Sequence, residues 1–209
     1  PSMKKLTLLL AGLILYAGTS FAQIDDRAVI PVAVTLNSIL RLNVTSGGNI
    51  EFNFNTLDDY QNGIATSAAY QTKFNVASSV NWDVIMYSEN ATLVGTDIIE
   101  DGGAGNFANT MTLDNIGYHV ISEGTIANDL TFASNDPGNP VPLTADPATV
   151  LVGYNGTVSN AGDIVANNFT IHWRCGTGEG TMNAQSVLGQ AIAADRYATN
   201  VFLVLQPAN

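Results

Sequence analysis

The stretch FNVASSVNWDVIMYS, residues 74–88, sets the fold class, because its apolar residues recur at every second position. Phe74 and Val76 flank an asparagine, and after a short serine-containing segment Trp82, Val84 and Met86 continue the same spacing. Side chains of a β-strand point alternately to the two faces of its sheet, so this period predicts strands with one face in a core. The polar segment between the two runs predicts a hairpin.

Similar short runs, separated by Gly, Asn, Asp, Ser and Pro, continue along the chain. The chain shows no βαβ rhythm, and this texture indicates an all-β protein, a β-sandwich or a barrel. Residues 184–194 contain apolar residues at helical spacing, so we expect one short helix there. The predicted strands are Ala28–Leu36, Ile39–Thr45, Asn49–Asn55, Tyr70–Ala77, Trp82–Ser88, Tyr118–Ser122, Leu130–Ala133, Thr149–Tyr154, Asn168–Cys175 and Thr199–Gln206.

The first 22 residues have the features of a secretory signal peptide. Lys4 and Lys5 precede an apolar core from Leu6 to Tyr16, and Ser20-Phe21-Ala22 forms a small-x-small cleavage site. The apolar core is shorter than the ~20 residues that span a bilayer. We therefore expect a secreted protein, extracellular or at the cell surface, with residues 23–209 as a single β-sandwich domain that begins with an arm, residues 23–36.

Net charge and cysteine content limit the possible partners and disulfides of the protein. The full chain has 7 basic and 18 acidic residues, and both lysines of the leader are lost on cleavage, so residues 23–209 carry a net charge of −13. Such a surface repels a phosphate backbone, and we expect no nucleic-acid partner. Cys175 is the one cysteine, which excludes an intramolecular disulfide and leaves a buried thiol or an intermolecular disulfide as alternatives.

The residues give no catalytic motif, so we expect no enzyme. His119 and His172 lie at alternating positions in strand-like runs, and His172 is three residues from Cys175, which on a strand places the two on opposite faces. No nucleophile elbow, zinc-protease motif or phosphate-binding loop occurs. We expect no metal site and no cofactor, apart from loose calcium binding by acidic loops that contain Asp58, Asp59, Glu100 and Asp101.

Trp82 and Trp173 allow two interpretations. Each belongs to an alternating apolar set, which favours packing in the core. Aromatic rings of this kind also stack on sugars, so glycan contact by Trp82 and Trp173 is the alternative, and cell-surface or host glycans are then partners.

Both ends of the predicted domain carry strands that are apolar on both faces. At the N-terminal end the apolar side chains are Ala28, Ile30, Val32, Val34 and Leu36, and at the C-terminal end Val201, Leu203 and Leu205 share one face while Phe202 and Val204 occupy the other. Such a strand needs cover on both sides. Addition of a strand to the edge of another subunit's sheet supplies that cover, with main-chain hydrogen bonds and side-chain pockets. We therefore predict these segments to be assembly strands, the C-terminal one at an edge.

These features together resemble a family. The segments VAVTLNSILRLNV after a leader, FNVASSVNWDVIMYS and the final NVFLVLQP resemble secreted fimbrial and pilin-like β-sandwich proteins of Gram-negative bacteria. The resemblance implies an antiparallel β-sandwich of the Ig-like or pilin-like kind. It also implies a structural subunit of an extracellular filament, pilus or sheath, in which copies of the chain form a homopolymer by donor-strand addition. A carbohydrate-binding module or adhesin is the alternative. A soluble sandwich in which both terminal strands are central to their own sheets is a third interpretation.

Overall fold

The computed structural model describes residues 30–99, 108–126 and 130–208. Its contacts divide the chain into two units, Pro1–Leu36 and Asn37–Asn209. In the first unit, residues 30–36 form no helix or strand, and Ile30, Val32, Val34 and Leu36 are 78 to 88% exposed. The strand predicted at Ala28–Leu36 is therefore absent from residues 30–36, while Ala28 and the predicted signal peptide lie outside the described residues.

The second unit consists mostly of antiparallel β-sheet, as predicted. A five-stranded sheet has the order β1-β2-β10-β6-β8, a four-stranded sheet has the order β12-β3-β9-β7, and a three-stranded sheet has the order β11-β4-β5. The strands are β1 (Leu40–Ser46), β2 (Gln71–Ser78), β3 (Trp82–Ser88), β4 (Thr92–Ile99), β5 (Ala108–Thr112), β6 (Ile116–Ser122), β7 (Leu130–Phe132), β8 (Val141–Pro142), β9 (Val150–Tyr154), β10 (Asn168–Cys175), β11 (Tyr197–Ala198) and β12 (Val201–Pro207).

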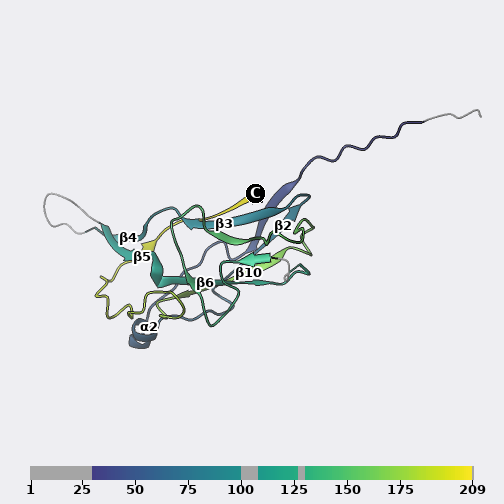
Figure 1. Cartoon of the computed structure of the whole chain (residues 1–209). Coiled ribbons are helices and arrows are strands. Elements are labelled where there is room, and N and C mark those ends of the chain that lie inside the picture. Colours follow the sequence, from purple (N-terminus) through teal and green to yellow (C-terminus); the bar gives the residue numbers. More distant parts are fainter. Residues whose placement is uncertain (1–29, 100–107, 127–129, 209) are drawn as a thin grey trace, which may run out of the picture. The chain divides into compact units, whose positions relative to one another are not determined.

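The core lies between the five-stranded and the four-stranded sheet. In Figure 1, β3 of the four-stranded sheet lies above β6 and β10 of the five-stranded sheet. Phe74 of β2 stacks on Phe169 of β10 with ring centroids 5.2 Å apart, and Trp82 of β3 meets Phe169 edge-on at 5.9 Å. All three side chains are fully buried. The alternating residues of the two sheets therefore share one core, which confirms the prediction of an all-β, sandwich-like fold.

The hairpin predicted within residues 74–88 is wrong. β2 pairs with β1 and β10, whereas β3 pairs with β12 and β9, so the chain crosses from one sheet to the other between Ser78 and Trp82. Asn160 fixes this crossing, because its side chain exchanges hydrogen bonds with the main chain of Trp82 at 3.0 and 2.8 Å and its carbonyl accepts the indole N–H at 2.7 Å. Both runs face the same core, and this common face produces the same alternation as a hairpin.

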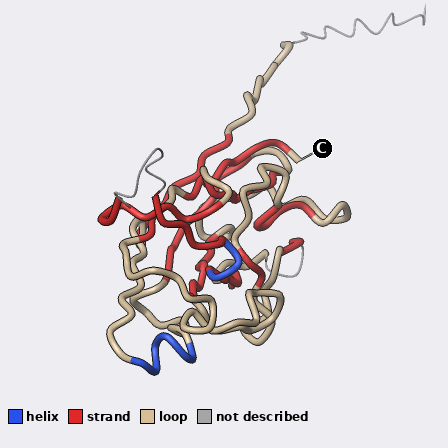
Figure 2. Tube along the Cα trace, turned by 90° about the vertical axis from the view of Figure 1, so that its left-hand side faces the viewer, coloured by secondary structure: helices blue, strands red, loops and turns tan. Residues whose placement is uncertain are grey.

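The helix predicted at residues 184–194 is also wrong, because that segment is built of turns. Val187 enters the core while Gln190 exchanges amide hydrogen bonds with Asn115 at 2.7 and 3.0 Å, and Ala191 has φ +50°. A regular helix does not satisfy these contacts together. Figure 2 shows helices confined to short segments.

The described α-helix is α2 (Leu57–Asn62), and a 3₁₀ turn, η1, spans Leu113–Asn115. The α2 helix begins with a capping box, in which Thr56 and Asp59 each accept from the other's main-chain N–H. In the described part of the chain, no helix has the length and apolar character needed to cross a membrane.

Candidate functional site

An apolar groove of about 870 Å³ opens into the core of the second unit. Its floor is formed by buried side chains from both main sheets and from the β4–β5 pair. These include Met86, Leu93, Met111, Ile171, Trp173 and Cys175. Binding sites are usually concave with an apolar floor, so the groove is the first candidate for a binding site.

The first wall of the groove is residues 49–55, which the sequence predicts to be a strand. In the structure this segment belongs to no strand, although Ile50, Phe52 and Phe54 are half-buried and the residues between them are exposed. Phe52 stacks on Tyr70 with ring centroids 4.5 Å apart. Within the described residues, the main-chain groups of residues 50–54 make no hydrogen bond to other main-chain groups. This wall therefore has the side-chain pattern of a strand and an unpaired main chain.

The second wall leads into β12, whose Val201, Phe202 and Leu203 line the groove. β12 pairs with β3 from Val201 to Pro207 and is the first strand of its sheet, so its other edge has no strand partner among the described residues. Leu203 and Leu205 pack against the core, whereas Phe202 is 40% exposed.

β1 closes the groove from the five-stranded sheet. It is also an edge strand, and its Leu42 and Val44 line the groove. Val44 is 44% exposed although it points to the same side as the core residues of β1's partner strand. The groove thus lies where unpaired edges approach a poorly covered part of the core. Such an arrangement can take up an extended chain, since the edges offer main-chain donors and acceptors and the floor offers apolar contact.

The two tryptophans lie in the core rather than on a sugar-binding surface. Trp82 is fully buried, and Trp173 is 7% exposed with its indole N–H donated to Thr72 Oγ1 at 2.9 Å. Trp173 reaches solvent through the floor of the groove. Neither ring is presented for stacking on a glycan.

Among the described residues, neither Cys175 nor the acidic pair Asp58 and Asp59 belongs to a metal-binding cluster. Cys175 is a free thiol on the floor of the groove, and burial raises its pKa to about 12. Asp59 caps α2, and hydrogen bonds from the main chain of Thr56 and Asn55 lower the pKa of its carboxyl group. Across residues 30–99, 108–126 and 130–208, no cluster of three His, Cys, Asp or Glu residues is placed to hold a metal ion. Glu100 and Asp101 lie outside the described residues.

A polar cluster formed by His119, His172 and Arg174 was not predicted from the sequence. The sequence places His119 and His172 in separate strands as ordinary strand residues, and the structure brings their rings together, with centroids 4.7 Å apart, beside Arg174. Cross-strand register is the missing information, because His172 is directly opposite His119 only in the pairing of β10 with β6.

Comparison with known proteins places the chain in no family, since no protein-family model matches it and no curated protein matches its sequence. The groove, its edges and the exposed segment 30–36 are therefore the observations from which a function is inferred.

Proposed function

We propose that this protein is a structural subunit of an extracellular filament, and that residues 30–36 of one copy add as a strand to the groove of the next. One observation carries the proposal. The chain combines a groove that has unpaired edges with a segment of its own whose alternate apolar side chains are exposed.

For residues 30–36 to bind, both the apolar floor of the groove and the unpaired edges must contribute favourable free energy. Burying Ile30, Val32, Val34 and Leu36 contributes about 6 to 12 kcal/mol, at about 1.5 to 3 kcal/mol for each side chain. Ordering seven residues costs about 7 to 14 kcal/mol. These terms nearly cancel, so the main-chain hydrogen bonds, each worth about 0.5 to 1.5 kcal/mol, decide the outcome. A strand that pairs with both β12 and residues 49–55 gains two rows of such bonds.

The two halves of this contact lie on different parts of the chain. A contact between unlike surfaces is heterologous, so a pair of subunits still has one free groove and one free arm. Assembly then continues at both ends, which is the property of a filament subunit. The predicted leader, residues 1–22, and the strongly acidic composition support a protein that is exported and that stays soluble until it is assembled.

Two single substitutions test this directly. Val34→Asp places a charge in the arm, and Val44→Asp places one in the groove of an otherwise unchanged chain. We expect the wild-type protein, with residues 1–22 removed, to form filaments in electron micrographs, and each variant alone to stay monomeric by light scattering. An equimolar mixture of the two should give a 1:1 dimer, because one intact arm can enter one intact groove, and nothing longer.

Thr35→Asp is the matched control for the arm, since residue 35 lies on the opposite face of an extended segment from residue 34. This variant should still assemble. A wild-type protein that remains monomeric at every concentration, or a variant mixture that contains no dimer, contradicts the proposal. A monomer in which residues 30–36 are protected from proteolysis shows instead that the arm occupies its own groove.

A further inference from the structure

The outer face of β10 carries polar side chains that are buried, which is unusual for the solvent side of a sandwich. Thr170, His172 and Arg174 alternate with the core residues of this strand, yet Thr170 and Arg174 are 1% and 4% exposed. Two segments contact Arg174 on this face, residues 134–139 and residues 176–182.

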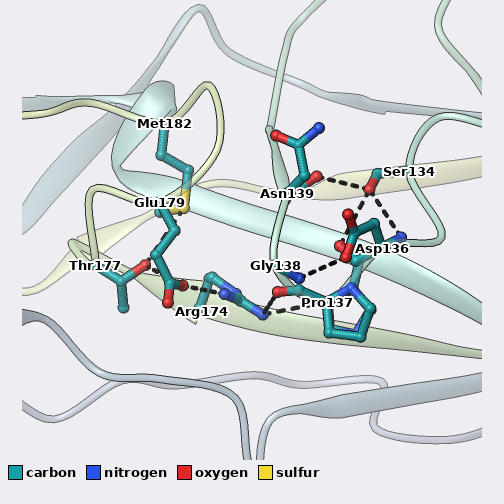
Figure 3. A network of polar contacts seen from close by, with 10 residues as sticks. Ser134, Asp136, Pro137, Gly138, Asn139, Arg174, Thr177, Glu179 and Met182 are labelled. Atoms are coloured by element: carbon teal, nitrogen blue, oxygen red, sulfur yellow. Dashed lines mark hydrogen bonds and ion pairs between the residues drawn. The ribbon is translucent and has the colours of Figure 1, made fainter.

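Arg174 joins these two segments to the sheet. Its Nη1 pairs with Glu179, and its Nη2 donates to the carbonyl oxygen of Pro137 at 3.0 Å (Figure 3). The same Nη2 lies 3.3 Å from Nδ1 of His119 on β6. One guanidinium group therefore connects β10, β6 and both covering segments.

This geometry determines the protonation state of His119. A guanidinium group only donates hydrogen bonds, so Nδ1 of His119 must accept and carries no proton. The ring is 2% exposed and stacks on His172 with planes 11° apart. A proton on Nδ1 removes the hydrogen bond and places a positive charge against the Arg174 guanidinium.

We propose that His119, His172 and Arg174 form an acid-sensitive latch, which holds residues 134–139 and 176–182 on the outer face of the sheet and releases them when His119 is protonated. The latch is separate from the groove and does not rest on the proposed assembly.

The charged groups around His119 come from three directions. His172 and Arg174 face it from β10, Asp136 from one covering segment and Glu179 from the other. Burial lowers the pKa of His119 to about 4, and the positive charges of His172 and Arg174 act in the same direction, against the two carboxylates. The neutral ring that the hydrogen bond demands is therefore also the form that the surroundings favour.

His172 has its own neighbours. Burial lowers its pKa, Arg174 and Lys73 act in the same direction, and Glu123 opposes them. Gln71 of β2 lies opposite His172, with Nε2 3.4 Å from its Nδ1. The positive charge of His172 opposes protonation of His119, and His119 is the ring that contacts Arg174, so His119 operates the latch.

Release does not require the covering segments to unfold. Ser134 Oγ donates to the Asn139 carbonyl at 2.7 Å, and Gly138 N–H donates to Asp136 at 2.8 Å, so residues 134–139 keep their own turn (Figure 3). What changes is the docking of this turn on the sheet, where Arg174 donates to the Pro137 carbonyl and the Val120 N–H of β6 donates to the Ser134 carbonyl at 2.8 Å.

Hydrogen exchange measured by mass spectrometry on the folded protein tests the latch. After correction for the intrinsic pH dependence of exchange, we expect the peptide that contains Val120, whose N–H donates to the Ser134 carbonyl, and peptides that cover residues 176–182 to exchange at least tenfold faster at pH 4 than at pH 7. Peptides from β3 should not change. His119→Gln keeps an oxygen that accepts from Arg174 and cannot be protonated, so its Val120 and 176–182 peptides should exchange equally at both pH values.

A histidine NMR titration of the wild-type protein keeps the test valid if that variant does not fold. The His119 ring should titrate at the midpoint of the exchange change. Titration of His119 at its ordinary value near 6.5, unchanged exchange at pH 4, or the same acid response in a folded His119→Gln variant would each overturn the latch.

Discussion

Phe52 stacks on Tyr70 with ring centroids 4.5 Å apart, although no strand in the described part of the chain pairs with residues 49–55. Side chains alone therefore fix this wall of the groove. Phe54 supports it in the same way, since its ring meets Tyr60 at 5.4 Å. An edge whose side chains are already fixed in place loses little further conformational freedom when a strand adds to it.

Replacing Phe52 with Ala should loosen this wall. The half-buried ring contributes apolar contact and an aromatic pair, so we expect the free energy of unfolding to fall by about 1 to 3 kcal/mol. Urea denaturation followed by circular dichroism measures the change. Asn53→Ala, in the same segment but exposed, should stay within about 0.5 kcal/mol of the wild-type protein. Equal losses in the two variants would show that the ring does not support the wall.

Cys175 should be nearly unreactive in the folded protein. It is 3% exposed, and because burial raises its pKa to about 12, almost none of the thiolate is present at pH 8. Labelling by iodoacetamide at pH 8 should be at least a hundredfold slower in buffer than in 8 M urea. A non-reducing gel should show no disulfide-linked dimer. Rapid labelling of the folded protein would mean that the floor of the groove opens to solvent.

The sequence predicts which residues face the core better than it predicts which strands pair. β3 and β10 match their predicted bounds, and their apolar positions are buried. The partner of each strand depends on long-range register, and the pattern in residues 74–88 is the same whether the chain turns back or crosses to the other sheet. β4 and β5 were not predicted, because Thr92–Ile99 and Ala108–Thr112 alternate weakly and bury few side chains.

The candidate site was predictable only in its parts. Residues 30–36 and β12 stand out by composition, but the groove depends on the absence of a partner for residues 49–55, and the absence of a partner leaves no trace in a sequence. Ile50, Phe52 and Phe54 alternate as they would in a paired strand. The histidine pair depends on register in the same way, since Gln71, His172 and His119 meet across three strands.

Thr56 should be the residue on which α2 depends. Its Oγ1 accepts the Asp59 N–H at 3.2 Å, and the helix has six residues, too few to be stable by itself. Thr56→Ala should lower the free energy of unfolding by about 1 kcal/mol, while Thr56→Ser should leave it nearly unchanged. Thermal denaturation compares the three proteins. If the alanine and serine variants melt at the same temperature, the cap does not contribute to global stability.

Stability should fall in mild acid because of His119. Its pKa is about 4 in the folded protein and near 6.5 when unfolded, so between these values the unfolded chain binds a proton that the folded chain does not. The contribution of this ring is complete above pH 6.5, is lost as the pH falls toward 4, and does not change further below that. We expect a loss of roughly 2 to 4 kcal/mol across this range. Urea midpoints at pH 7, 5.5 and 4 measure this loss of stability. In His119→Gln, the part of the pH dependence that this ring causes should disappear, whereas the part that the carboxylates cause should remain. Parallel pH dependence in the wild-type and His119→Gln proteins would assign the acid sensitivity to the carboxylates instead.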